Sequence, residues 1–255
     1  MRSLRVLVVA MVAGAMCSSA SAALFFENFE SYDAGEFLHD LAGWKGWDDS
    51  AAYGSPVSDT YAYSGSKSVE ISGAADLVHE YNIDGGKWVF TAMQYIPSGT
   101  SGDTYFLLLS RYAADREWSI QDKFTLGSGI WTAEFGGDVT TDIVYDKWVE
   151  LRYVIDLDNN TVDQYYDSKL VSTHAWSASN ATTIGVIDLY GNNASSVYYD
   201  DIKIQSYQST LTAADNPSPA GQAVDVPRDA VLGWTPGVYA AKHDVYFGTS
   251  ADDVA

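Results

Sequence analysis

The chain has 255 residues, with 34 acidic and 14 basic side chains and a net charge of −20. A surface this acidic excludes nucleic acids and anionic membranes as binding partners. The single cysteine excludes an internal disulfide framework, and with only four histidines it also argues against a zinc site or a thiol nucleophile.

Residues 1–22 have the composition of a secretory signal peptide rather than of a folded element. A basic start precedes an apolar run over 6–15, and the small residues Ala-Ser-Ala at 20–22 supply a cleavage site. The apolar run is too short to span a bilayer, and the only cysteine, Cys17, lies in the same segment. We therefore expect a secreted or cell-surface bacterial protein, without disulfide bonds and without membrane insertion.

The rest of the chain shows the period of β-strands. Apolar residues recur at every second position between turn residues, and no stretch has the period of a long helix. The stretch 103–112 is apolar on both faces, which predicts a central strand. Asp158-Asn159-Asn160 is a strong hairpin signal between two such stretches. The clearest predicted strands cover 87–96, 103–112, 116–126, 130–135, 147–157, 161–173, 183–191 and 196–207. The pattern predicts an all-β fold, an antiparallel sandwich or barrel.

The composition changes after the last predicted strand. Residues 208–221 form a predicted linker that ends in Asn-Pro-Ser-Pro-Ala-Gly. The segments that follow, AVDVP, AVLGW and HDVYFGT, resemble the opening strands of an immunoglobulin-like or fibronectin type III module. Such a module needs about 100 residues, more than 222–255 supply. We expect an incomplete β-rich module here, and additional domains in the same longer chain.

A set of motifs in residues 24–207 resembles the concanavalin A-like, or laminin G-like, jelly-roll domain of secreted bacterial proteins. The motifs are the opening FENFESY (26–32), the Gly43-Trp44 and Gly46-Trp47 pairs, YSGSKSVEI (63–71), KWVFTAMQYIPS (87–98), the hairpin 147–171 and the closing YYDDIKI (198–204). One departure from the family pattern is the turn at 167–169, Asp-Ser-Lys, which lacks the usual glycine.

The resemblance implies an antiparallel two-sheet jelly-roll sandwich over residues 23–207, with one sheet concave. Members of this fold include lectins, carbohydrate-binding modules, laminarinase-like hydrolases and polysaccharide lyases. The fold alone does not choose among these activities.

No catalytic site is predicted. A retaining glycosidase needs two carboxylates about 5–5.5 Å apart, which on one strand means alternate positions. The laminarinase-like hydrolases of this fold carry a Glu-x-Asp-x-Glu motif on one strand, and this sequence lacks it. Asp156 and Asp158 come closest but sit at a hairpin turn, and the adjacent Asp200 and Asp201 point to opposite faces. The histidines match no lyase motif. A hydrolase or lyase with an unrecognised site is therefore the least favoured interpretation.

Acidic residues of the first and last strands suggest a structural Ca²⁺ site. Calcium takes six to eight oxygen ligands from carboxylates, backbone carbonyls and water. In a sandwich of the resembled type the first and last strands lie together, which would bring Glu30 close to Asp200 and Asp201. We predict that these three residues hold the ion. The alternative is that they only charge a sheet edge or bond to nearby backbone.

Two surfaces are candidates for ligand binding. Strand phase assigns one set of polar side chains to an outer sheet face, where they would suit sugar hydroxyls, although any solvated sheet face has a similar composition. The same phase assigns Trp118 to the core. Trp44 and Trp47, in a glycine-rich loop, form an alternative platform for stacking on sugar rings. The residues of the predicted sheet face are Arg111, Gln121, Lys123, Glu150, Arg152, Asp188 and Tyr190.

The favoured function is a non-catalytic, lectin-like module that binds a polysaccharide or another extracellular glycan. The main alternative is a structural or adhesive module of a cell-surface protein, without a sugar site of its own.

Overall fold

The computed structural model describes residues 23–112, 115–207, 215–218 and 231–235. The predicted signal peptide and most of the predicted linker and C-terminal module lie outside the described residues. Residues Ser21–Tyr207 form one compact unit. In the other unit, the described strands β17 (Asp215–Ser218) and β18 (Gly233–Thr235) pair antiparallel.

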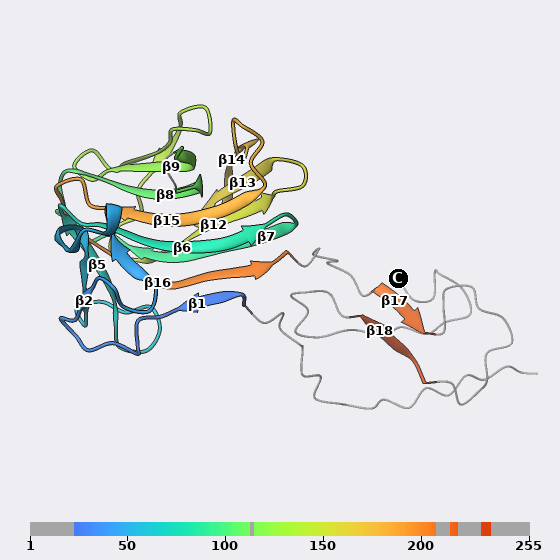
Figure 1. Cartoon of the computed structure of the whole chain (residues 1–255), viewed down its shortest axis with the longest axis horizontal. Helices are drawn as coiled ribbons and strands as arrows, with labels where there is room; N and C mark the ends of the chain where they lie inside the picture. Colours follow the sequence, from blue (N-terminus) through green and yellow to red (C-terminus); the bar gives the residue numbers. More distant parts are fainter. Residues whose placement is uncertain (1–22, 113–114, 208–214, 219–230, 236–255) are drawn as a thin grey trace, which may run out of the picture. The chain divides into compact units, whose positions relative to one another are not determined.

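The compact unit is an antiparallel two-sheet jelly-roll sandwich, as predicted (Figure 1). Its first sheet has nine strands over the described residues, and β1 (Phe25–Glu27) joins it by pairing with β16. The remaining order is β14 (Lys169–Ala175), β13 (Thr161–Tyr166), β12 (Trp148–Asp156), β7 (Lys87–Tyr95), β16 (Ala194–Ser206), β5 (Ser68–Gly73), β4 (Ser55–Ser58) and β2 (Phe37–Leu38).

The second sheet has seven strands in the same described region. Its order is β11 (Val139–Asp142), β10 (Ile130–Ala133), β9 (Glu117–Thr125), β8 (Asp103–Arg111), β15 (Thr183–Tyr190), β6 (Asp76–Asp84) and β3 (Trp44–Gly46). The strand predicted as central from its apolar character on both faces is β8, which has β9 on one side and β15 on the other.

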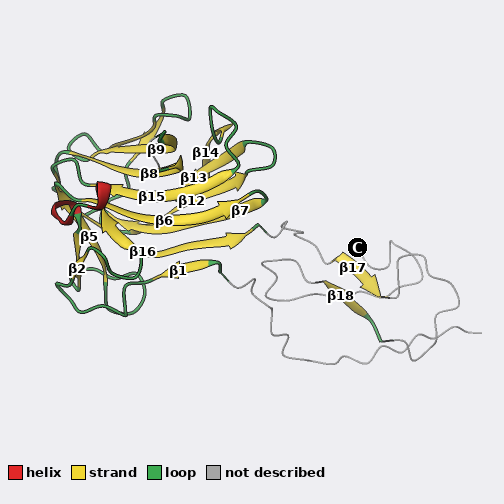
Figure 2. Cartoon of the chain, in the orientation of Figure 1, coloured by secondary structure: helices red, strands yellow, loops and turns green. Residues whose placement is uncertain are grey.

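Among the described residues, helical structure is confined to two single turns that follow β3 (Figure 2). These are the 3₁₀ segments η1 (Trp47–Asp49) and η2 (Ala51–Tyr53). Among the residues that the structure describes, no helix is long and apolar enough to cross a membrane.

The core lies between the two sheets and is rich in aromatic rings. Phe106 of β8 and Tyr153 of β12 stack across it with ring centroids 5.3 Å apart, and Trp131 stacks on Tyr166 at 5.5 Å. All four are at most 3% exposed. Burying a large apolar side chain contributes roughly 1.5–3 kcal/mol, so this interior stabilises the fold without covalent cross-links.

The seven-stranded sheet is apolar on its outer face as well. Side chains alternate along a strand, so Phe106 and Leu108 enter the main core while Leu107 and Leu109 point outward. Val78 of β6 and Val186 of β15 join the two outward leucines in a second buried cluster. Trp47, Tyr105, Tyr112 and Tyr190 pack against it. An apolar outer face covered by aromatic side chains sets this sheet apart as a surface to search for a site.

Candidate functional site

A groove of about 330 Å³ opens on the outer face of the seven-stranded sheet. This volume lies in the range of pockets that bind small organic ligands. The groove crosses the strands rather than following one of them. Its lining residues are Trp47, Asp76, Tyr105, Leu107, Trp118, Gln121, Asp188, Tyr190 and Asn192.

The strand register arranges the lining residues in parallel rows. Leu107 of β8 pairs with Gln121 of β9 and with Asp188 of β15, and this row forms the floor. Two residues before Leu107 on β8, Tyr105 pairs with Tyr190 of β15. Two residues after Leu107, Leu109 pairs with Trp118 of β9. The groove therefore has a polar floor with an aromatic row on each side.

One wall consists of two tryptophans. Trp47 and Trp118 stack with ring centroids 6.2 Å apart and an interplanar angle of 21°. The guanidinium of Arg116 lies 4.8 Å from the Trp47 ring, a cation–π contact. Trp118 remains 38% exposed, so its ring is available to a ligand.

The loop that carries Trp47 is fixed at both ends. A Cβ at Gly46 would lie 2.0 Å from the carbonyl oxygen of Ser50, so only glycine fits at this position. The backbone N–H of Asp48 donates to the Tyr112 hydroxyl at 2.8 Å, and the Tyr112 ring contacts Trp47 edge-on at 5.0 Å. These contacts hold the tryptophan over the sheet.

The opposite wall consists of two tyrosines in directly paired positions. The rings of Tyr105 and Tyr190 stack with centroids 5.8 Å apart and an interplanar angle of 22°. The Tyr190 hydroxyl donates to Oδ1 of Asn192 at 2.9 Å, which fixes the orientation of the amide at the groove edge.

A pair of carboxyl groups lies in the floor. Asp188 is only 3% exposed, and burial raises its pKa well above the usual range for aspartate. The pKa of Asp76, its hydrogen-bond partner, is raised as well, chiefly by burial. Each of two such close carboxyl groups disfavours the ionisation of the other, and the charge of Asp76 raises the pKa of Asp188 further. Oδ1 of each residue is buried, and in the described part of the chain it has no donor from a residue outside the pair.

Four of the residues predicted to bind a ligand line this groove: Trp47, Gln121, Asp188 and Tyr190. Two more, Arg111 and Lys123, lie on the same sheet but not in the groove lining. Arg111 pairs with Asp115 at 3.2 Å and Glu117 at 2.9 Å, and Lys123 pairs with Asp103 at 2.9 Å.

Three predicted ligand residues lie elsewhere. Trp44 is fully buried and packs on Phe29 with ring centroids 5.7 Å apart, so the prediction of an exposed platform at this residue was wrong. Glu150 and Arg152 belong to β12 of the nine-stranded sheet, on the opposite side of the sandwich from the groove. Alternation shows which side of a strand faces the core, but it does not show which sheet the strand joins.

Trp118 was assigned to the core and lies instead in the groove, because β9 contains a bulge. Leu108 pairs with Ile120, but the next residue, Leu109, pairs with Trp118, so Ser119 is an extra residue. A bulge of one residue reverses the face of every side chain before it. Sequence reasoning also missed Asp76, Tyr105 and Asn192. Tyr105 belongs to a strand that is apolar on both faces, where alternation carries no information.

The residues predicted for calcium are engaged in hydrogen bonds to the loop 63–67. Oε1 of Glu30 accepts the backbone N–H groups of Ser66 and Lys67, both at 2.7 Å, which lowers its pKa. Oδ2 of the buried Asp200 accepts two further backbone N–H groups of the same loop, at 2.8 and 3.0 Å. Oδ1 of Asp201 accepts the Ser64 hydroxyl at 2.6 Å. The three carboxylates do not gather their oxygens within 4.8 Å of one another. They hold the loop 63–67 instead.

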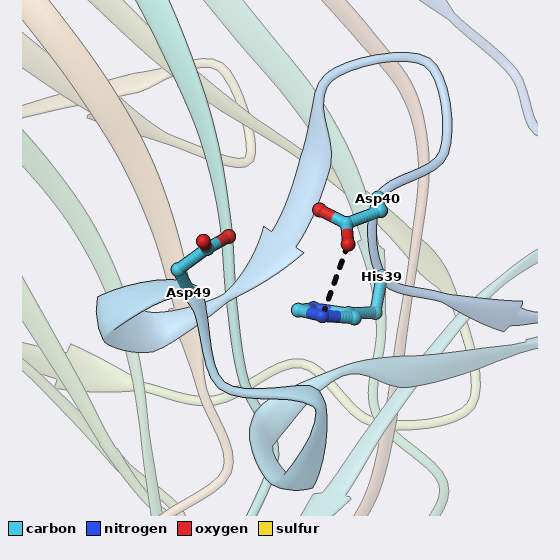
Figure 3. Close-up of side chains that lie close together, drawn as sticks. All are labelled: His39, Asp40 and Asp49. Carbon is cyan, nitrogen blue, oxygen red and sulfur yellow. Dashed lines mark ion pairs between the residues drawn. The ribbon is translucent and has the colours of Figure 1, made fainter.

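A different trio does come within metal-binding distance. Ligand atoms of His39, Asp40 and Asp49 lie within 4.8 Å of one another (Figure 3). However, Nδ1 of His39 accepts the backbone N–H of Gly46 at 3.3 Å. Nε2 of the same ring faces Asp40 at 3.4 Å. Both ring nitrogens therefore already have protein partners, so we interpret this cluster as a contact within the loop.

No protein-family model matches the chain, and no curated protein matches it. Solved structures do resemble it. A sialidase is 12% identical, with a TM-score of 0.53 over 76% of this chain and 19% of that protein. The family 22 carbohydrate-binding module of Clostridium thermocellum Xyn10B is 13% identical, with a TM-score of 0.43 over 75% of this chain and 99% of the module. The carbohydrate-binding module CBM66 from Bacillus subtilis is 15% identical, with a TM-score of 0.43 over 67% of this chain and 100% of the module.

The likeness to the sialidase shows a shared sandwich fold and no more, because the identity is low and the chain spans 19% of the sialidase's length.

Proposed function

We propose that the compact unit is a non-catalytic module that binds a polysaccharide or another extracellular glycan in the groove. The observation that supports this proposal is the pairing of aromatic walls with a polar floor. A sugar ring has apolar C–H faces that pack on aromatic rings, and it has hydroxyl groups that bond to amides and carboxyls at its edge. The groove offers Trp47 and Trp118 on one side, Tyr105 and Tyr190 on the other.

The carboxyl pair suits binding better than glycoside hydrolysis. Hydrolysis with retention needs carboxyl groups about 5–5.5 Å apart, and inversion needs about 6.5–9.5 Å. Asp76 and Asp188 are hydrogen-bond partners, which leaves no room for an anomeric carbon and a water between them. A hydrolase or lyase therefore stays the less favoured alternative, and a purely adhesive module is the other.

We also propose that the protein is exported, that it is extracellular or lies at the cell surface, and that the longer chain contains further domains. They rest on the sequence of residues 1–22 and 208–255. A structural Ca²⁺ stays a prediction, and the hydrogen bonds of Glu30, Asp200 and Asp201 do not support it at those residues.

Affinity electrophoresis in gels that contain plant or marine polysaccharides tests the proposal. Trp47→Ala and Trp118→Ala should each weaken binding about tenfold or more, because central aromatic contacts contribute about 2 kcal/mol or more. Tyr63→Ala is the matched control, since Tyr63 is 51% exposed and its ring contacts Trp148 of the nine-stranded sheet.

Unchanged mobility of the wild-type chain on every polysaccharide would contradict glycan binding. Equal losses in Tyr63→Ala and the two tryptophan variants would contradict the location. Release of reducing ends from a bound polysaccharide would favour the hydrolase alternative.

A further inference from the structure

We propose that the Asp76–Asp188 pair makes the groove selective for glycans of neutral sugars, and that it excludes polymers of uronic acids. This inference rests on the proposed function and names its class of ligand. Three properties of the site support it: the position of the pair, the charges around it, and the acceptor atoms that it offers.

The position of the pair forces any bound ligand to meet it. Asp188 stands in the floor row, and Asp76 pairs with Tyr190 of the neighbouring strand β15, diagonally across from Asp188. Both carboxyl groups line the groove. Since the aromatic rows flank the floor, a sugar ring packed between them presents its polar edge to this pair.

The surroundings of the pair give it no compensating positive charge. Asp48 of η1 adds a further negative charge near Asp76. Arg116 is engaged in an ion pair with that same Asp48. Lys123 of β9 pairs with Asp103 at 2.9 Å. The groups that face the pair from β8, β9 and β15 are the two tyrosines and Gln121, which are neutral at pH 7.

On β3, Lys45 stands opposite Val78 in the register, on the outward face of the sheet. Its ammonium group pairs with Glu80 at 2.6 Å. Every basic group near the groove is therefore engaged with its own carboxylate. A uronate placed in the groove would meet a buried negative charge without a partner, and such like-charge contacts cost several kcal/mol.

The pair keeps acceptor capacity for a ligand. A pair that shares one proton carries one negative charge, and the buried Oδ1 atoms, which have no donor from another residue of the described part of the chain, are the ones that the shared proton fits. The other oxygen of each carboxyl group then remains to accept a hydroxyl group of a ligand in the groove that both residues line. Hydroxyl groups of a neutral sugar are the donors that match, and bonds to an ionised acceptor are about twice as strong as those between neutral groups. A neutral glycan thus gains from the same charge that repels an anionic one.

Affinity electrophoresis of the full chain at one salt concentration measures this selectivity. Gels contain either neutral polymers (xylan, mixed-linkage glucan, mannan) or polyuronates (polygalacturonate, alginate). We expect retardation by at least one neutral polymer and binding to polyuronates at least about 100-fold weaker, from a cost of about 3 kcal/mol. The double variant Asp76→Asn/Asp188→Asn keeps the shape of the site and removes its one negative charge, so it should strengthen polyuronate binding at least tenfold. Asp138→Asn, an exposed residue of the β10–β11 turn, controls for the loss of one charge.

The outcomes separate the inference from the proposed function. If no polymer of either kind retards the wild-type chain, glycan binding itself fails. If polyuronates retard it as strongly as neutral polymers, glycan binding stands and the selectivity is wrong. Tighter binding to chitosan than to any neutral polymer would also overturn the inference, because the pair would then be a site for sugar ammonium groups. The wild-type comparison decides these cases even if the double variant does not fold.

Discussion

The carboxyl group of Asp122 shows how a single buried residue couples this fold to pH. It lies between the sheets, where Oδ2 accepts the Tyr153 hydroxyl at 2.6 Å and Oδ1 accepts the Gln164 amide at 2.9 Å. Both hydrogen bonds favour the ionised form, yet burial outweighs them and raises the pKa of Asp122 to about 7.

This pKa makes the stability contribution of Asp122 depend on pH. The folded pKa of about 7 exceeds the ordinary aspartate pKa of 3.8, so the folded state binds more protons between these two pH values. The contribution of Asp122 to the free energy of unfolding is full below about pH 4, where it reaches roughly 4 kcal/mol. It is lost as the pH rises to about 7. In Asp122→Asn, the part of the pH dependence of stability that Asp122 causes should vanish. Urea unfolding of the wild-type protein and the variant from pH 4 to 8 measures this difference. Parallel profiles of unfolding free energy against pH would contradict the raised pKa of Asp122. Asp200, whose pKa is raised to about 6, adds a slope of the same sign to both proteins.

Residue-level prediction from sequence worked where the strand alternation is clean. Gln121 and Asp188 alternate with core residues, and both line the groove. Trp118 could not be placed, because the bulge at Ser119 depends on pairing with β8 rather than on local sequence. Tyr105 could not be distinguished from core residues, because both faces of its strand are covered.

At the scale of elements, the groove depends on a short loop between β3 and β4. Gly46 precedes η1, and Asp48 and Asp49 within it have φ angles of 52° and 62°. The backbone there turns sharply enough to bring Trp47 back over the sheet, where Tyr112 and Trp118 hold it. The loop has no partner in the main core beyond its ends, so its conformation is set by these few contacts.

Replacing Gly46 with alanine should displace this loop. The new Cβ would lie 2.0 Å from the Ser50 carbonyl and 2.9 Å from the Gly54 nitrogen. We expect glycan affinity to fall at least tenfold, with Trp47 no longer stacked on Trp118. Gly127→Ala, at a turn where a Cβ meets no atom within 4 Å, is the control. Isothermal titration with a bound oligosaccharide and tryptophan fluorescence measure the two effects. Unchanged affinity in Gly46→Ala would mean that the loop does not form part of the site.

The positions of the longer strands could be predicted, because each carries its own alternation and turn residues. The number of strands could not: β6 and β11, for example, were not among the predicted strands. The assignment of strands to sheets could not, because it is decided by contacts distant in sequence. Glu150 and Arg152 illustrate this: their outward phase was correct, but β12 pairs with β7 and β13 in the nine-stranded sheet. The jelly-roll topology therefore came from the resemblance of motifs and not from strand phase.

For the whole molecule, the first and last strands of the sandwich close it. Phe26 of β1 pairs with Lys203 of β16, and Glu30 and Asp200 both bind the loop 63–67. The ammonium group of Lys67 donates to the carbonyl oxygens of Glu30 at 3.1 Å and Tyr32 at 2.5 Å. Lys67 thus ties the loop 63–67 to the backbone that follows the first strand.

Thermal melting tests the role of Lys67. We expect a midpoint several degrees lower in Lys67→Met, because carbonyls that lose a charged donor cost about 1–3 kcal/mol. Lys169→Met, at an exposed position of β14, is the control, and equal midpoints of the two variants would contradict this role. A wild-type midpoint that is higher in calcium chloride than in chelator would support the prediction of a structural calcium ion.

The separation of the two apolar clusters has a consequence for engineering. The cluster beneath the groove shares no residue with the main core, so we expect substitutions on the groove surface to affect this outer cluster more than the interior. A library that varies Trp47, Gln121 and Asn192 would explore new sugar preferences on a constant scaffold. The cysteine-free sandwich is suited to selection in any cellular compartment, since its folding does not depend on oxidation.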